Sequence, residues 1–402
     1  MPTLRELTAG PWRAVPVLGV TQILAWGAMF YPPVLTVPLI AADHGWSTTF
    51  AMGGFSLGLL VAGFVAPRVG AAIDRHGGHR VMPIGSLVGA LGLVGLVHAN
   101  SPPAYLAVWA VIGAGMAASL YDPAFATLGR IFGAAARSPI TALTLAGGFA
   151  STVSWPATHF LLEAIGWRGT YLIYAGLLAF VAAPLHAFAL PRTRAETAPL
   201  PRGGAVTKPA PVLASNGAAF LLVAAAFASY AFVPSGLSAH LLAIFQRFGL
   251  EPGTVVAIGA LFGPSQVAAR VVEFAFARNV HPLWVARFAV TVLVAAFALL
   301  ALAGLSTTIA IAFAVMFGAA NGLVTITRGT VPLALFGPVG YGRLIGRIAG
   351  PSLLMQAIAP LVLAFVAERL SDSAALALAA GFALVALTCF LAIRRPRPDT
   401  ID

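Results

Sequence analysis

Apolar residues fill long runs along this chain, and short polar segments separate the runs. A helix of about 20 residues is long enough to cross a hydrocarbon core of roughly 30 Å. The pattern predicts twelve membrane-spanning helices that begin near residues 14, 48, 81, 104, 138, 168, 213, 253, 283, 307, 344 and 373. The runs lack the alternation of apolar and polar positions that is typical of a membrane β-barrel. An all-α membrane protein is therefore predicted.

One polar segment, 191–211, divides the predicted helices into two sets of six. Its sequence, PRTRAETAPLPRGGAVTKPAP, is rich in proline and basic residues and has no apolar periodicity, as is typical of an exposed linker. We therefore predict an N-terminal six-helix half at 1–190, a cytoplasmic linker at 191–211 and a C-terminal six-helix half at 212–402.

A weak internal repeat supports the two halves. The fourth predicted span reads GAGMAASLYDPAFATLGRIFG from Gly113, and the tenth reads GAANGLVTITRGTVPLALFG from Gly318. With one gap, Asp122 falls opposite Arg328. Parallel repeats of this kind occur in transporters, whose substrate site lies at the repeat interface near the middle of the membrane.

Composition and charge narrow the class of protein. The chain is 59% hydrophobic and 9% charged, with a mean hydropathy of +0.93, which excludes an ordinary water-soluble protein. The net charge of +11 comes from Lys and Arg residues that concentrate on one side of the predicted spans, nineteen against three, with Arg270 inside a span. This asymmetry argues against a nucleic-acid binder and predicts that both termini are cytoplasmic in a multi-pass protein of the inner (plasma) membrane.

Motifs for other chemistries are missing from the sequence. There is no GxxxxGK[ST] phosphate loop, HExxH motif or GxSxG elbow, which argues against an ATP-driven pump and against an enzyme. The only cysteine, Cys389, lies in the last predicted span and supports neither a disulfide framework nor a thiol metal site. We expect no cofactor and no metal.

Three ionisable residues fall deep in predicted spans: Asp122, Arg270 and Glu273. Such residues cost about 2.5 to 3.5 kcal/mol each on insertion and usually face a cavity or a partner. Gln266, Arg270 and Glu273 are four and three residues apart, so they share one helix face. We interpret Arg270 as the anchor for an anionic group, because guanidinium offers a planar fork to a carboxylate, and Glu273 as its counter-charge in the empty site.

Each of these residues has an alternative interpretation. Arg270 and Glu273 would form an intrahelical pair that only lowers the insertion cost, or Glu273 would be a gate contact near the helix end. Asp122, next to Pro123 where the helix is expected to bend, would load and release a proton as its surroundings wet and dry. Its alternative is a salt bridge with Arg328, or with an arginine of the cytoplasmic loops, that forms and breaks during alternating access.

The loop after the second predicted span, GAAIDRHGGHR, resembles a loop motif of the major facilitator superfamily. The positions that fit the motif are Gly70, Asp74, Arg75, Gly77 and Arg80, while His79 departs from it. The resemblance implies the twelve-helix major facilitator fold, a monomer by analogy, and a loop that acts as a latch between the halves on the cytoplasmic side. Asp74 would there meet Arg343 and Arg347 at the start of the eleventh span.

Within that superfamily the chain is most similar to the monocarboxylate and oxalate/formate carriers. The similarity rests on LYDPAFATL in the fourth span, GWRGTY after the fifth and the arginine of QVAAR in the eighth. It implies that Arg270 binds a substrate carboxylate. Gln266 stands where many monocarboxylate carriers have an acidic residue, and Gln356 where oxalate exchange uses a lysine, which disfavours a dicarboxylate. Drug antiporters fit less well, since Trp109 replaces their fourth-span arginine.

Polar and aromatic residues near the middle of the spans complete the predicted substrate site: Trp26, Tyr31, Tyr230, Asn321 and Gln356. Their alternative roles are hydrogen bonding between helices and packing. Together these observations predict a proton-coupled secondary active transporter for a small organic anion such as a monocarboxylate, with the anion, protons and the lipid bilayer as partners. The alternative function is export of a neutral or amphiphilic compound.

Overall fold

The structure, a computed structural model, describes residues 10–192, 217–277 and 279–394. Within these residues all regular secondary structure is helical. In this part of the chain ten helical stretches are long and apolar enough to cross a membrane. The predicted linker 191–211, apart from its first two residues, lies outside the described residues, as do 1–9, Arg278 and 395–402. The helical prediction is thus confirmed, while the number of crossings and the side of the termini stay predictions.

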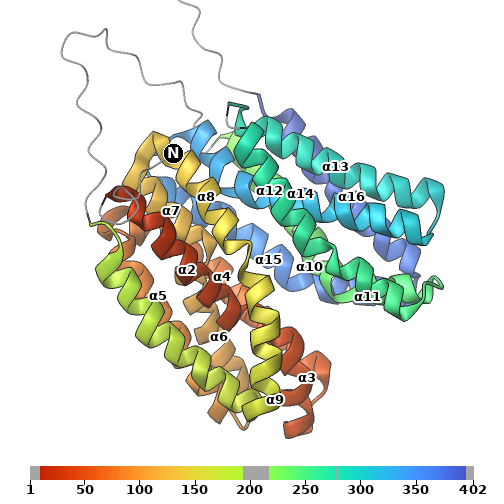
Figure 1. The fold of residues 1–402 in the computed structure, drawn as a ribbon, viewed down its shortest axis with the longest axis horizontal. Helices are drawn as coiled ribbons and strands as arrows, with labels where there is room; N and C mark the ends of the chain where they lie inside the picture. Colours follow the sequence, from red (N-terminus) through yellow and green to blue (C-terminus); the bar gives the residue numbers. More distant parts are fainter. Residues whose placement is uncertain (1–9, 193–216, 278, 395–402) are drawn as a thin grey trace, which may run out of the picture.

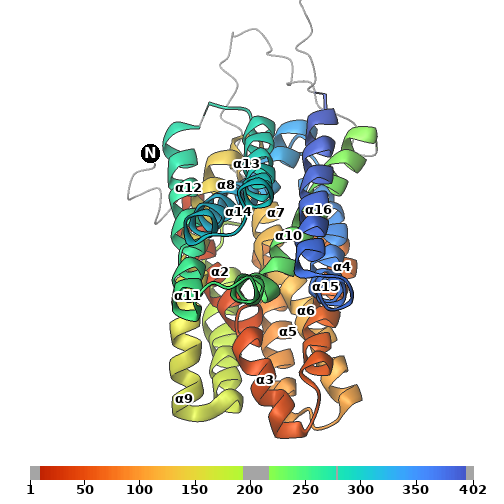
Figure 2. The same cartoon turned by 90° about the vertical axis from the view of Figure 1, so that its right-hand side faces the viewer.

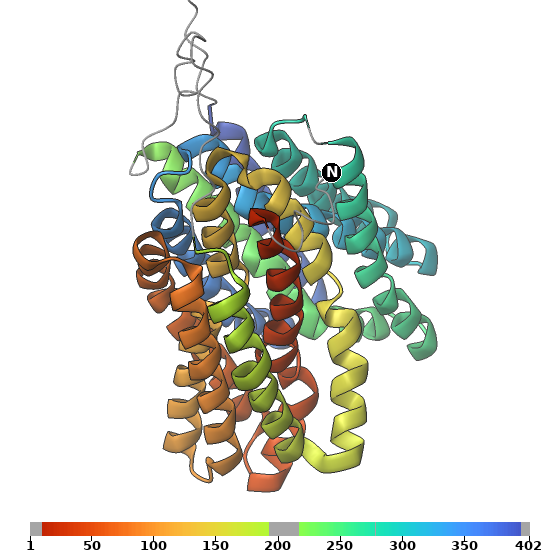
Figure 3. The ribbon, with the colours of Figure 1, turned by 60° about the vertical axis from the view of Figure 1, so that its left-hand side comes forward.

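The first half, defined here as residues 10–192, begins with a short 3-10 turn, Pro11–Arg13, and ends with two π-helical turns, Leu178–Ala182 and Leu185–Ala189. The helices between them are α2 Ala14–Met29, α3 Pro33–His44, α4 Thr48–His76, α5 Gly78–His98, α6 Pro102–Ser119, α7 Tyr121–Phe132, α8 Arg137–Gly147 and α9 Ala150–Leu177. At Gly166, whose φ is +68°, α9 folds back on itself, close to the predicted boundary between spans five and six (Figure 3).

The second half, residues 217–394, contains seven helices in its described part. They are α10 Ala218–Arg247, α11 Pro252–Ala260, α12 Phe262–Phe276, α13 Pro282–Ala303, α14 Thr307–Phe336, α15 Tyr341–Arg369 and α16 Asp372–Ala392. The start of α2 and the end of α16 lie at the same end of the molecule (Figure 1).

The two halves touch at one end and diverge toward the other (Figure 1), and in Figure 2 the second half stands in front of the first. We call these the joined end, which holds the turns near residues 77, 133–136 and 337–340, and the separated end, which holds those near 45–47, 99–101, 248–251, 304–306 and 370–371. At the separated end, side chains cap the first turns of four helices: Ser47, Glu251, Ser306 and Ser371 accept backbone N–H groups of α4, α11, α14 and α16.

The closest contact between the halves runs along α4 and α15, and glycines allow it. A Cβ at Gly70 would collide with the carbonyl of Gly342, and one at Gly346 would collide with the carbonyl of Ala66. Small residues of this kind let two membrane helices approach backbone to backbone. The backbones of α4 and α15 therefore meet directly at the joined end.

Four of the predicted spans are broken near their middles. The breaks separate α2 from α3 at 30–32, α6 from α7 at Leu120, α8 from α9 at 148–149 and α11 from α12 at Leu261. The sequence predicted a bend only beside Pro123, and the break lies three residues earlier, at Leu120, which is extended with ψ −159°. Pro123 has no N–H to continue a helix and restricts the residue before it. Broken helices at mid-membrane are typical of transporter binding sites.

Candidate functional site

Arg270 lies on α12, nine residues beyond the break at Leu261, and is only 4% exposed. Its Nε donates to the carbonyl of Gly322 at 3.3 Å, and one terminal nitrogen donates to the carbonyl of Thr144, on α8 of the first half, at 2.9 Å. The other terminal nitrogen is 3.5 Å from Oε1 of Gln266, at the limit of a hydrogen bond. No ion pair within residues 10–192, 217–277 and 279–394 includes Arg270. A buried positive charge is thus held by neutral acceptors.

Glu273 does not neutralise Arg270 in this structure. The interpretation of Glu273 as the counter-charge of Arg270 is therefore wrong, and so is the alternative of an intrahelical pair. Glu273 is 4% exposed and pairs with Arg137 of the first half at 3.5 Å. Arg137 also donates to the carbonyl of Ala277 at 2.9 Å. Arg270 does not reach Glu273 because long side chains on a helix lean toward the N-terminus of the helix. Arg270 accordingly reaches back to Gln266, away from Glu273.

Three tyrosines lie near the guanidinium of Arg270. Tyr31, Tyr121 and Tyr230 are close enough to experience its charge. Tyr31 falls in the break between α2 and α3, and Tyr121 begins α7 directly after the break at Leu120. Tyr121 was not among the predicted site residues, because its place beside Arg270 depends on a helix break that the apolar pattern does not reveal.

Two tryptophans extend this aromatic group on the first half. The ring centroid of Trp26 lies 5.1 Å from that of Tyr121 and 5.9 Å from that of Tyr31. Trp155, on α9, lies 6.4 Å from Tyr31 and was also missed by the sequence analysis. The indole N–H of Trp26 donates to Gln22 at 3.1 Å, so its polar atom is already satisfied. We call Trp26, Tyr31, Tyr121 and Trp155 the aromatic wall.

The remaining predicted substrate residues lie on the second half. Tyr230, on α10, donates its hydroxyl to Oδ1 of Asn321, on α14, at 3.0 Å. Gln266 and Gln356 are half-buried on α12 and α15. The structure therefore places Tyr230, Asn321 and Gln266 near Arg270 or its hydrogen-bond partners. Among the described residues no hydrogen bond joins Gln356 to Arg270, and the backbone carbonyl of Gln356 accepts from Ser235.

Asp122 and Arg328, which the internal repeat set opposite each other, form an ion pair across the halves. Both carboxylate oxygens accept from the guanidinium, at 3.0 and 2.8 Å, in a two-point geometry that joins α7 to α14. The side chains are 16% and 20% exposed. The pair lies on the joined side of the breaks, where α7 runs toward the turn at 133–136.

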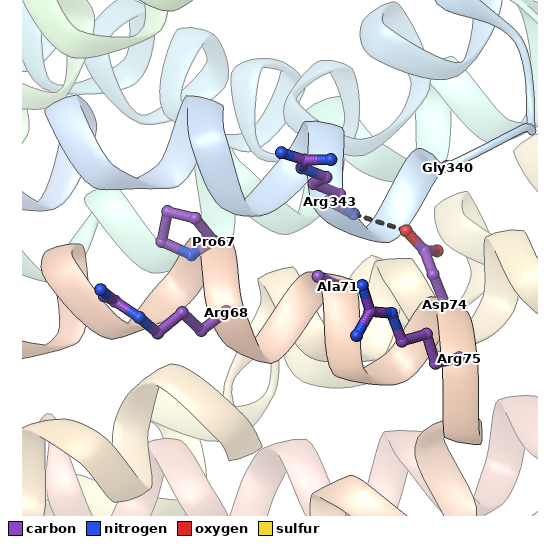
Figure 4. Close-up of a pocket in the computed structure, with 7 residues that line it drawn as sticks. All are labelled: Pro67, Arg68, Ala71, Asp74, Arg75, Gly340 and Arg343. Carbon is purple, nitrogen blue, oxygen red and sulfur yellow. Dashed lines mark hydrogen bonds between the residues drawn. The ribbon is translucent and has the colours of Figure 1, made fainter.

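Asp74 closes the joined end in a way that the sequence did not predict. Its carboxylate accepts the backbone N–H groups of Gly342 at 2.9 Å and Arg343 at 2.8 Å, in the first turn of α15 (Figure 4). It therefore caps a helix of the other half, where free N–H groups and the helix dipole favour an anion. The expected contacts with the side chains of Arg343 and Arg347 are absent from the described structure, and Arg347 instead lies 4.3 Å from the ring of Phe220.

The other residues of the predicted loop latch differ in their relation to this cap. Gly70 permits the close approach of α4 to α15, and Gly77, with φ +83°, ends α4. Arg130 of α7 donates to the backbone carbonyl of Asp74 and fixes that end. Arg75, together with Arg68 and Arg343, lines a surface hollow of about 570 Å³ (Figure 4), and Arg80 is exposed.

Known proteins share sequence and fold with this chain. The sequence profile described as Major Facilitator Superfamily matches residues 17–331. The chain is 33% identical to monocarboxylate transporter 11 of Mus musculus over 138 residues, which are 33% of this chain and 28% of that protein. It is 30% identical to monocarboxylate transporter 3 of Gallus gallus over 177 residues, 42% of this chain and 31% of that protein. The matches thus span less than a third of either relative.

Solved structures show the same fold. The human organic anion transporter MFSD10 (TETRAN) has a TM-score of 0.72 at 17% identity, covering 97% of this chain and all of that one. FucP, a major facilitator transporter in the outward conformation, has a TM-score of 0.70 at 14% identity and covers 94% of this chain and 97% of its own. At such identities the likeness concerns the fold alone.

Proposed function

The chain belongs to the major facilitator superfamily, whose members are membrane transporters and not enzymes, and from this premise we propose that it carries a small organic monocarboxylate by alternating access. One observation carries the proposal: Arg270 is a buried positive charge between the two halves that only neutral groups contact in the described structure. A carboxylate is a stronger acceptor for guanidinium than a carbonyl, so an anion would complete this site. The monocarboxylate transporters among its relatives agree with this.

We further propose twelve crossings, with the joined end in the cytoplasm. The proposal is supported by the start of α2 and the end of α16 at that end, and by the many Lys and Arg residues predicted on the same side. In this orientation the structure corresponds to an outward-facing state of an inner-membrane carrier. The cargo would enter between the halves from the separated end.

Binding and gating would be linked through Arg270 itself. In the present state its bond to the Thr144 carbonyl ties the second half to the first. An incoming carboxylate would compete for the same guanidinium and weaken that tie. For the joined end to open, the Asp74 cap, the Asp122–Arg328 pair and the Arg137–Glu273 pair must then separate.

Proton coupling belongs to the same proposal and has two candidate carriers. Protonation of Asp122 would remove the charge that holds Arg328, and protonation of Glu273 would do the same for Arg137. Either event would loosen the joined end, which links a proton to the change of state. The alternative is that both pairs are gates that stay charged throughout.

Ligand-induced thermal stabilisation of the purified protein tests the function. A ligand that binds only the folded protein raises its melting temperature, so a panel of carboxylates, neutral compounds and cationic drugs identifies the cargo class. We expect a monocarboxylate to stabilise the protein, and Arg270→Gln to abolish that effect. Arg168→Gln, at an exposed arginine of the separated end, is the matched control and should bind as the parent does.

Stabilisation by neutral or cationic compounds that survives Arg270→Gln would overturn the anion proposal. It would favour the export of a neutral or amphiphilic compound instead.

A further inference from the structure

The two sides of the Arg270 site differ in chemistry. The first half contributes the four rings of the aromatic wall. The second half contributes the guanidinium with the amides of Gln266 and Asn321, and one ring, Tyr230, whose hydroxyl donates to Asn321. A cargo that contacts both sides needs an anionic group at one end and a flat apolar group at the other. A short acid would satisfy the guanidinium and leave the aromatic wall without a partner.

The aromatic wall is held in place by hydrogen bonds that do not use its ring faces. The backbone N–H of Tyr31 donates to the carbonyl of Trp26 at 3.0 Å, which keeps the two rings together across the break after α2. The indole N–H of Trp26 is taken by Gln22, whose own amide donates to the carbonyl of Ser119 at 2.8 Å, where α6 ends. Other rings already cover part of this wall, since Tyr121 stacks on Phe125 at 5.3 Å and Phe30 packs against Trp26 and Tyr31. Trp155, beside Tyr31, is 37% exposed and is the most exposed of the four residues. Trp155 thus offers the main surface against which a ligand can pack.

We propose, resting on the proposed function, that the cargo is an aromatic monocarboxylate whose carboxylate binds Arg270 and whose ring packs against Trp26, Tyr31 and Trp155. Aromatic rings attract one another edge to face or offset, beyond the area that they bury. A saturated ring of the same size offers similar apolar area without that attraction. The aromatic wall therefore selects for a planar aryl group.

The same geometry disfavours a free amino acid. An α-ammonium group next to the carboxylate is best stabilised by an anionic partner, since burying a charge without a counter-charge is costly. The acidic side chains of the two gates, Asp122 and Glu273, are already paired with Arg328 and Arg137. The site therefore accepts an aryl acid in preference to the corresponding aromatic amino acid.

Calorimetric titration of the purified full-length protein with four probes tests this inference: phenylacetate, cyclohexylacetate, acetate and phenylalanine. We expect phenylacetate to bind about fivefold more tightly than cyclohexylacetate, as one aromatic contact is worth roughly that factor. Trp155→Leu should remove most of this difference and leave acetate unchanged. Phe160→Leu, at a 68% exposed position on the same helix, is the matched control and should change nothing. Tyr31→Leu repeats the test if Trp155→Leu does not fold.

The possible results separate the two proposals. Equal binding of the aryl and saturated acids, with both lost in Arg270→Gln, would overturn the aromatic class and leave the monocarboxylate function standing. Binding of phenylalanine as tight as that of phenylacetate would overturn the exclusion of amino acids. Carboxylate binding that does not depend on Arg270 would overturn the proposed function itself.

Discussion

At the joined end, polar side chains reach from one half to the other; at the separated end, they stay within a half. Asp122 pairs with Arg328 across the halves, whereas Asp43 pairs with Arg168 inside the first half at 2.5 Å. The second half has its own such pair, Arg247 with Asp372, at 2.7 Å. Arginine–aspartate pairs thus connect the two halves at the joined end, and connect helices of the same half at the separated end.

The exposure of these pairs sharpens the difference. Asp122 and Arg328 are 16% and 20% exposed, while Asp43 and Arg168 are 41% and 44% exposed. Partly buried pairs are costly to break because they leave a desolvated charge, whereas exposed pairs contribute little. In the proposed alternating access, the pairs at the joined end would therefore act as a switch between the halves. The pairs at the separated end would act as braces within each half that persist when the halves move.

Breaking the pair across the halves should have the largest effect. Arg328→Gln leaves Asp122 without a partner, which we expect to cost about 3 kcal/mol and to shift the balance toward an open joined end by on the order of a hundredfold. Spin-label distances in a Cys389→Ser background measure this, with one label pair at Ala135 and Val339 of the joined end and one at Asn100 and Ser306 of the separated end.

The joined-end distance should lengthen and the separated-end distance should shorten. Exchange of the two residues, Asp122→Arg with Arg328→Asp, should restore both distances. Unchanged distances in Arg328→Gln would show that the pair does not hold the gate.

A second substitution at this pair distinguishes the two proposed roles of Asp122, which are proton coupling and gating. Asp122→Asn in reconstituted vesicles should be assayed for proton-driven accumulation and for exchange of labelled cargo. Loss of accumulation with exchange retained would assign proton coupling to Asp122, and loss of both would assign it to the gate.

The helix cap at Asp74 should have an intermediate effect. Asp74→Ala removes the acceptor for two backbone N–H groups, which costs about 1 kcal/mol and shifts the conformational balance roughly fivefold toward an open joined end. Arg343→Gln should leave the same spin-label distances unchanged, because Asp74 contacts only the backbone of that residue. An equal shift in both variants would mean that the side-chain charge matters after all.

The brace within the second half should have the smallest effect. Arg247→Gln removes a pair whose arginine is 52% exposed and which lies within one half. We expect a loss of at most about 0.5 kcal/mol and no change of conformational balance. Differential scanning measures the first quantity and the separated-end label pair measures the second. A shift as large as that of Arg328→Gln would abolish the distinction between switch and brace.

The features that depend on periodic patterns could be predicted from the sequence. The apolar runs indicated the helical architecture, and the repeat alignment set Asp122 opposite Arg328, which are indeed paired across the halves. Both features can be predicted without the three-dimensional structure, because helix length and the alignment of the repeats are properties of the sequence. The depth of Arg270 in its span was visible for the same reason.

Other features could not be predicted from the sequence. They depend on backbone groups that no motif marks, or on residues that lie far apart along the chain. Every helix start offers backbone N–H groups, so nothing in the sequence marks Gly342 and Arg343 as the partners of Asp74. The partner of Glu273, Arg137, lies 136 residues away without a shared motif. Tyr121 joins the site only because its span breaks at Leu120, and apolar residues fit a broken span as well as a continuous one.

The solitary charge of Arg270 also has an electrical meaning. A membrane potential does work on net charge that moves through the field, up to roughly 2.3 kcal/mol per charge per 100 mV. A carrier that binds an anion alone is neutral at this site when loaded and positive when empty, so voltage acts only on its empty return. If a proton accompanies the anion, both steps move the same charge and the cycle is electroneutral. Current recorded across a membrane therefore reveals whether a proton travels with the cargo.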